Sequence, residues 1–110
     1  MKNLVIHHPV DKVICEGKKS FANCMKRMVG EGFAISKANV AALKAGDNVI
    51  VLCSSKGYER RAEGQLEKLV HSGKTGSGLK RYDVFIKDLI EVPYHRSDFG
   101  KLNHNGVAIF

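Results

Sequence analysis

Cations, hydroxyl groups and one aromatic ring lie together between residues 54 and 61, which read Ser-Ser-Lys-Gly-Tyr-Glu-Arg-Arg. Hydroxyls and backbone amides of a turn can contact phosphate oxygens, cations add long-range attraction, and a ring can stack on an unpaired base. The spacing of a P-loop is absent, so this motif does not predict binding of a nucleoside triphosphate. The segment indicates either a nucleic-acid-binding loop or an ordinary hairpin tip with solvated charges.

A second pairing of cations with an aromatic ring occurs at Lys80-Arg81-Tyr82, directly after the glycine- and serine-rich segment 71–78. Alternation along an extended chain would send Arg81 and Tyr82 to opposite faces. Arg81 is therefore either a binding residue or a solvated charge. Tyr82 either stacks on a ligand or packs in the core with its hydroxyl at the edge.

The balance of charge favours a polyanionic partner. The chain of 110 residues has 18 Lys and Arg against 11 Asp and Glu, a formal net charge of +7, and cations that neutralise phosphates release condensed counterions. The hydrophobic fraction of 44% and charged fraction of 26% fit a globular chain, which we expect to form one domain over residues 1–110. Long apolar runs typical of a membrane span or a signal peptide are absent, so we expect a cytoplasmic protein with no membrane partner.

Cysteines and histidines do not indicate a metal site. Cys15, Cys24 and Cys53 are odd in number and form no Cys-x-x-Cys pair, which predicts buried thiols in a reducing compartment. The five histidines have no metal-ligand spacing such as His-Glu-x-x-His. The sequence therefore predicts neither a metal nor a cofactor.

The pattern of apolar residues predicts an α+β fold, a small mixed β-barrel with two short helices. Strands are expected where β-branched and apolar residues lie between Gly, Pro and polar clusters: 4–6, 49–53, 61–70, 81–92 and 107–109. Pro93 is expected to end the strand 81–92. The continuous apolar run 49–53 predicts a central strand buried on both faces. Residues 65–70 also fit a helical stripe, which leaves a helix as the alternative there.

Two helices are expected, over 10–16 and over 37–45. Ser36 is a suitable N-cap for the second, Val40, Ala41 and Leu43 would face inward, and Gly46 would end it. Two segments that connect these elements are not expected to be helices. Residues 18–27 mix two periods and are expected to be extended or irregular, and residues 71–78 are expected to form a flexible connector.

The order of these elements resembles a known superfamily. A strand, a short helix ending in Gly17-Lys18-Lys19-Ser20, a helix that runs into the segment 46–52, and the glycine-containing strand 62–66 resemble the PUA-like superfamily, especially its ASCH and EVE branches. The resemblance implies a pseudo-barrel that binds RNA or modified bases, and some ASCH members look like amidohydrolases acting on acetylated cytidine. It places Lys19 at the mouth of the barrel pocket. Ala22 and Asn23 stand where the pattern usually has acidic residues or arginine.

The favoured hypothesis is a module that binds nucleic acid, either RNA or a modified or unpaired base, through a basic barrel mouth. Its binding residues would be Lys18, Lys19, Ser55, Lys56, Tyr58, Arg60, Arg61, Arg81 and Tyr82.

Two alternatives remain open. In a small-nucleoside amidohydrolase, Lys19 would be the base or anchor, Ser20 a hydroxyl group, and Glu63 or Glu67 the acid–base group, although alternation favours these glutamates as solvent-facing partners of Lys and Arg. The chain could instead be an interaction module for an acidic protein. No feature of the sequence establishes catalysis, the natural ligand or the oligomeric state.

Overall fold

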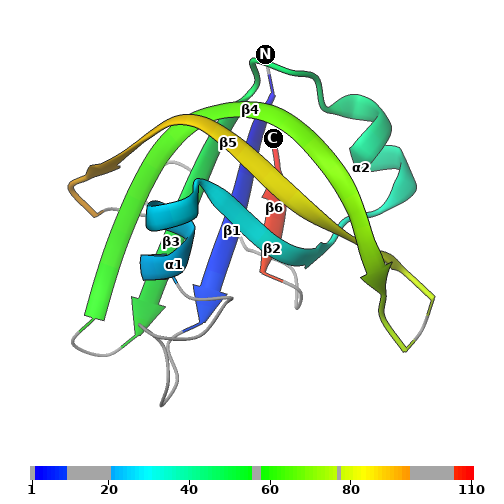
Figure 1. Cartoon of the computed structure of the whole chain (residues 1–110), viewed down its shortest axis with the longest axis horizontal. Helices are drawn as coiled ribbons and strands as arrows, with labels where there is room; N and C mark the ends of the chain where they lie inside the picture. The colour runs from blue at the N-terminus through cyan, green and yellow to red at the C-terminus, as the bar shows by residue number, and fades with distance from the viewer. Residues whose placement is uncertain (1, 10–20, 56–57, 77, 95–105) are drawn as a thin grey trace.

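A curled sheet of six strands, accompanied by two short helices, makes up the part of the chain that the computed structural model describes (Figure 1). The described residues are 2–9, 21–55, 58–76, 78–94 and 106–110. The elements are β1 (Asn3–Pro9), α1 (Phe21–Arg27), β2 (Val29–Ala34), α2 (Lys37–Ala42), β3 (Asn48–Ser55), β4 (Tyr58–Lys74), β5 (Lys80–Val92) and β6 (Val107–Ile109).

The strand order is β2-β5-β4-β3-β1-β6. β1 and β3 are parallel, and every other pair is antiparallel. All five predicted strands belong to this one sheet, which confirms the predicted mixed, barrel-like fold with two short helices. β3 lies between β4 and β1, as the apolar run predicted: Val49 and Val51 belong to the main core, and Ile50 and Leu52 to a smaller cluster on the other face.

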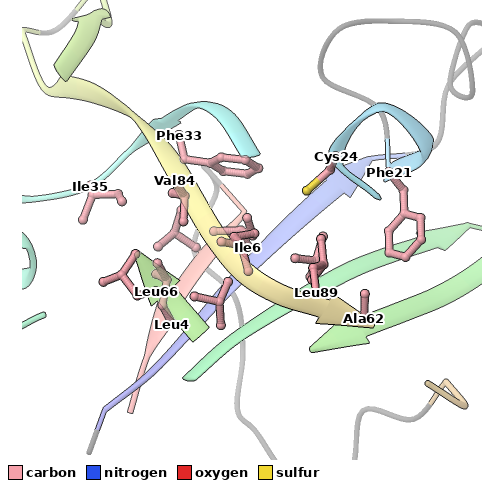
Figure 2. Packing of buried hydrophobic residues seen from close by; sticks show 14 of the residues in the cluster. Leu4, Ile6, Phe21, Cys24, Phe33, Ile35, Ala62, Leu66, Val84 and Leu89 are labelled. Atoms are coloured by element: carbon pink, nitrogen blue, oxygen red, sulfur yellow. The ribbon is translucent and has the colours of Figure 1, made fainter. Parts of the chain in front are cut away.

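The main core fills the concave, inner face of the sheet, and Figure 2 shows part of it. Phe21 and Cys24 of α1 cover the inner face from one side. β2 is one edge of the sheet, and its side chains meet those of β1 across the interior. The rings of His8 and Phe33 lie edge to face with centroids 5.2 Å apart. The half-barrel therefore brings β1 and β2 together by side-chain packing.

A β-bulge bends β5 where it passes Gly64 of β4. Glu63 is paired with Ile90 and Gln65 with Lys87, so two residues of β5 lie opposite the single Gly64. One of them, Asp88, has a φ of 53°. Bulges increase the local twist of a strand, and β4 and β5 arch over the half-barrel as one long hairpin (Figure 1).

The prediction of an extended segment over residues 18–27 was wrong for its described part, because Phe21–Arg27 is helix α1. The helical stripe formed by Phe21, Cys24 and Met25 packs against the core. Burial of this stripe outweighs the alternating pattern, since only a helix turns all three side chains to one side. The strand of this region is Val29–Ala34, which the sequence interpretation had not assigned.

Helix α2 begins as predicted, and the Ser36 hydroxyl accepts a hydrogen bond from the Asn39 amide (3.3 Å). It ends short of the predicted end because Leu43 is extended (ψ 144°) and buried in the core. Gly46 has a φ of 95°, but it lies in the turn after the helix. Ala41 was expected to face inward and is exposed, so that assignment was wrong.

The flexible connector predicted over 71–78 was wrong for its first half, since β4 continues through Lys74. The turn to β5 is closed by backbone hydrogen bonds between Thr75 and Leu79 (2.8 Å) and between Gly78 and Thr75 (3.0 Å). Residues 65–70 are strand, which excludes the helical alternative. The helix predicted over 10–16 lies outside the described residues. No helix of the described chain is long and apolar enough to cross a membrane.

Candidate nucleic-acid interface

Three residues of the predicted basic mouth lie outside the described residues: Lys18, Lys19 and Lys56. Ser20, the hydroxyl group of the amidohydrolase alternative, also lies outside them. For Ser55 and Tyr58 the structure describes only the backbone, which forms the last pair of the β3–β4 ladder. Four predicted binding residues have described side chains, and each of them is placed below: Arg60, Arg61, Arg81 and Tyr82.

Arg60 joins α1 to β5 on the inner side of the sheet. Its guanidinium lies 4.7 Å from the centre of the Phe21 ring, and it donates two hydrogen bonds to Glu91, from Nε (2.8 Å) and Nη2 (2.6 Å). Hydrogen bonding to Arg60 lowers the pKa of Glu91 against the opposing effect of partial desolvation. A carboxylate therefore already compensates the Arg60 charge.

Arg61 lies on the opposite face of β4, as alternation requires of a neighbour. It is paired across the ladder with the buried Leu52, and it is only 2% exposed. Its Nε donates to Glu63 (2.9 Å), whose own side chain is 45% exposed. Arg60 and Arg61 thus point to different faces, and the buried Arg61 guanidinium is not presented to a phosphate on the surface.

The glutamates of the enzyme hypothesis are both exposed. Glu63 forms the ion pair with Arg61 on the outer face, and Glu67 lies farther along β4. Neither carboxylate is among the buried polar residues of the described chain. No observation therefore favours these glutamates as the acid–base group of a pocket.

Arg81 is located near the opposite end of β5 from Glu91, the partner of Arg60. Arg81 and Glu91 are ten positions apart in the sequence, which corresponds to roughly 30 Å along an extended strand. Arg81 donates from Nη1 to the Gly32 carbonyl (2.7 Å), and Asp83 accepts from the Gly32 amide (2.9 Å). These two side chains bind the irregular part of β2, where Gly32 has a φ of 73°. The structure does not bring Arg81 and Arg60 to one mouth.

Tyr82 belongs to a different grouping, in the distal hairpin, which we define as residues 68–74 of β4 and 80–85 of β5. Tyr82 is half-buried against the core and is paired with His71, with ring centroids 5.8 Å apart. Two positions farther out, Lys74 is paired with Lys80. Alternation places Lys80 on the same face of β5 as Tyr82. The distal hairpin thus presents two rings and two ammonium groups on one face.

The charge of the two lysines is not compensated on their own face of the hairpin. The one acidic residue of the distal hairpin, Asp83, lies on the opposite face with Arg81, and both side chains are hydrogen-bonded to Gly32. Lys74 and Lys80 are exposed, and neither forms an ion pair with any described residue. The Lys80 carbonyl accepts from the Ile35 amide (3.2 Å), which brings the beginning of α2 next to this end of the hairpin.

The sequence analysis recognised Arg81 and Tyr82 but missed their neighbours Lys74 and His71. The sequence signal that could have indicated these two residues was the run of cations without an acidic residue over 68–82. It was not used because residues 71–78 were interpreted as a connector, whereas pairing of Lys74 with Lys80 depends on β4 continuing to Lys74.

No family model, curated protein or solved structure matches this chain. Within the described part of the chain, no group of three or more His, Cys, Asp or Glu side chains is arranged to hold a metal ion.

Proposed function

We propose that this protein binds nucleic acid and that the distal hairpin holds its phosphates. The observation that carries this proposal is the direct cross-strand pairing of two exposed lysines, Lys74 and Lys80. Like charges directly opposite each other destabilise a sheet, by an amount within the roughly 0.2–1 kcal/mol span of cross-strand pairs. Two neighbouring phosphates, one bound by each ammonium group, would offset this repulsion.

The surroundings of the lysine pair support an extended polyanion. The exposed Lys37 begins α2 close to the Lys80 carbonyl. The only acidic residue in the hairpin's part of β5, Asp83, is bonded to the Gly32 amide. Several phosphates along a strand would meet these cations in succession and release their counterions.

A nucleic acid explains the neighbouring rings, whereas an acidic protein explains only the cations. His71 and Tyr82 lie on the face that presents Lys74 and Lys80, and alternating cations and aromatic rings are typical of surfaces that bind single strands. The resemblance of the element order to the PUA-like superfamily supports the same ligand class. Within this ligand class, we propose RNA, or a modified or unpaired base, as the ligand.

The test compares two double variants with the same change in charge. Lys74→Gln/Lys80→Gln removes the paired ammonium groups, and Lys2→Gln/Lys26→Gln removes two exposed ones elsewhere. Binding of fluorescein-labelled single-stranded RNA and DNA would be measured by anisotropy between about 50 and 200 mM salt. We expect the first variant to lower the slope of log K against log salt by about 1.4, at about 0.7 per phosphate contact, and to bind more weakly than the second.

Equal losses in the two variants would overturn the proposed location. Absence of binding at low salt to both oligonucleotides would overturn the function. An acidic polypeptide, polyglutamate of similar charge, serves as the competitor. If it bound more tightly than the oligonucleotides, the protein would instead be an interaction module for an acidic partner.

A further inference from the structure

The His71 ring is exposed and yet held in one orientation. Its Nε2 lies 2.9 Å from the Gly73 carbonyl oxygen. Because a carbonyl only accepts, this bond requires the proton on Nε2. Tyr82, which is packed against the core, lies beside the ring at an interplanar angle of 55°. The imidazole is therefore fixed by its own strand and by the neighbouring strand while remaining open to solvent.

The position of this ring relative to the lysine pair suits a nucleotide. His71 is paired with Tyr82 and Lys74 with Lys80, and a bulge between His71 and Gly73 makes these pairs only two residues of β5 apart, roughly 7 Å along a strand. A chain whose phosphates contact Lys74 and Lys80 would carry a neighbouring base past His71. Since the ring is oriented before binding, stacking on it would cost little side-chain entropy.

We propose that His71 is the platform on which one unpaired base stacks while Lys74 and Lys80 hold the adjoining phosphates, so that the distal hairpin selects single strands over duplexes. This inference rests on the proposed function. In a duplex, both faces of an internal base are covered by its neighbours in the stack. The ring can therefore contact a base face only where the strand is unpaired.

The test uses three ligands of equal length, about 12 nucleotides: oligouridylate, an abasic ribose-phosphate chain, and a duplex that contains oligouridylate paired with oligoadenylate. Anisotropy titrations at about 50 mM salt would give the ratio of affinities for the uridylate and abasic chains. Stacking predicts a ratio of at least about fivefold in the parent protein. The affinity for the duplex, normalised to its number of strand ends and to its charge, should be lower than the affinity for the uridylate chain.

Two variants separate stacking from a merely structural contribution. His71→Ala should reduce the uridylate-to-abasic ratio to about one and leave the salt slope unchanged, and His71→Phe should restore most of the ratio because a ring is again present. Thermal unfolding of both variants verifies that they remain folded.

Different experimental results would overturn this inference and the proposed function. Equal, salt-dependent binding of the uridylate and abasic chains would overturn base stacking and leave phosphate binding intact. An equal loss for both ligands in His71→Ala would also overturn it, because the ring would then only support the hairpin. Binding of neither ligand would overturn the proposed function and the inference together.

Discussion

Substitution of Gly64 by alanine tests the bulge from which the β4–β5 hairpin arches. A Cβ at this position would lie 2.7 Å from the Lys87 carbonyl oxygen, 2.7 Å from Ile86 Cγ2 and 3.1 Å from Leu89 Cα. Two of these three atoms belong to the backbone of β5. A change of side-chain rotamer therefore cannot relieve the collision, and the two strands would have to move apart.

The expected loss follows from two opposing effects. Overpacking of a well-packed site costs about 1–3 kcal/mol, and the smaller conformational freedom of alanine in the unfolded chain returns about 0.4–1 kcal/mol. Because the contacts are with backbone, we expect the upper part of the first range and a net loss of about 2 kcal/mol in the free energy of unfolding. For a domain of this size that corresponds to a fall in Tm of roughly 8 °C.

The assay is urea and thermal unfolding followed by circular dichroism. Gly73→Ala is the matched control, since Gly73 lies in the same strand and a Cβ there would have nothing within 4 Å. This control should stay within about 0.5 kcal/mol of the parent or be slightly more stable. If Gly64→Ala were as stable as the parent, or no less stable than Gly73→Ala, the reasoning about the close approach of β5 would be refuted.

Three further predictions concern charge and the core. Lys74→Glu should form a cross-strand ion pair with Lys80, raising stability by up to about 1 kcal/mol while weakening oligonucleotide binding, as thermal melts and anisotropy would show; a loss of both would contradict it. The Lys44 backbone amide, the largest of the causes, lowers the pKa of Asp47, so the stabilisation from this carboxylate is present above the ordinary pKa of about 4 and is lost as pH falls below it. Urea unfolding between about pH 6 and 3 should therefore show a steeper loss in the parent than in Asp47→Asn, and parallel curves would contradict this. Burial, with a smaller contribution from the charge of a nearby glutamate, raises the pKa of Cys24 to about 12, so iodoacetamide at about pH 8 should label it only in urea, as peptide mass spectrometry would detect; labelling of the folded protein would contradict it.

The sequence determined the features that depend on a few adjacent residues. The apolar run 49–53 can be satisfied only by burial on both faces, and it forms the central strand β3. Ser36 caps the helix that follows it because its hydroxyl reaches an amide three residues away. Pro93 cannot donate to a ladder, and β5 ends directly before it.

The tertiary structure decided which residues of β4 and β5 share a face. Strict alternation from Leu66 would place Val70 inside, but a bulge between Leu66 and Lys68 reverses the pattern. Leu69 is therefore packed on the core, and Val70 is 41% exposed. Whether a strand accommodates an extra residue depends on its partner across the ladder, and adjacent residues do not reveal that partner.

The tertiary structure also decided which residues form the candidate interface. The net charge and the cation–ring pairing at residues 80–82 indicated a polyanion from the sequence alone. The separation of Arg60 from Arg81 and the pairing of Lys74 with Lys80 appear only in the folded sheet. Electrostatic attraction between two charges falls with the distance between them in space. For two residues on paired strands, the register of the hairpin sets this distance, however many residues separate them in the sequence.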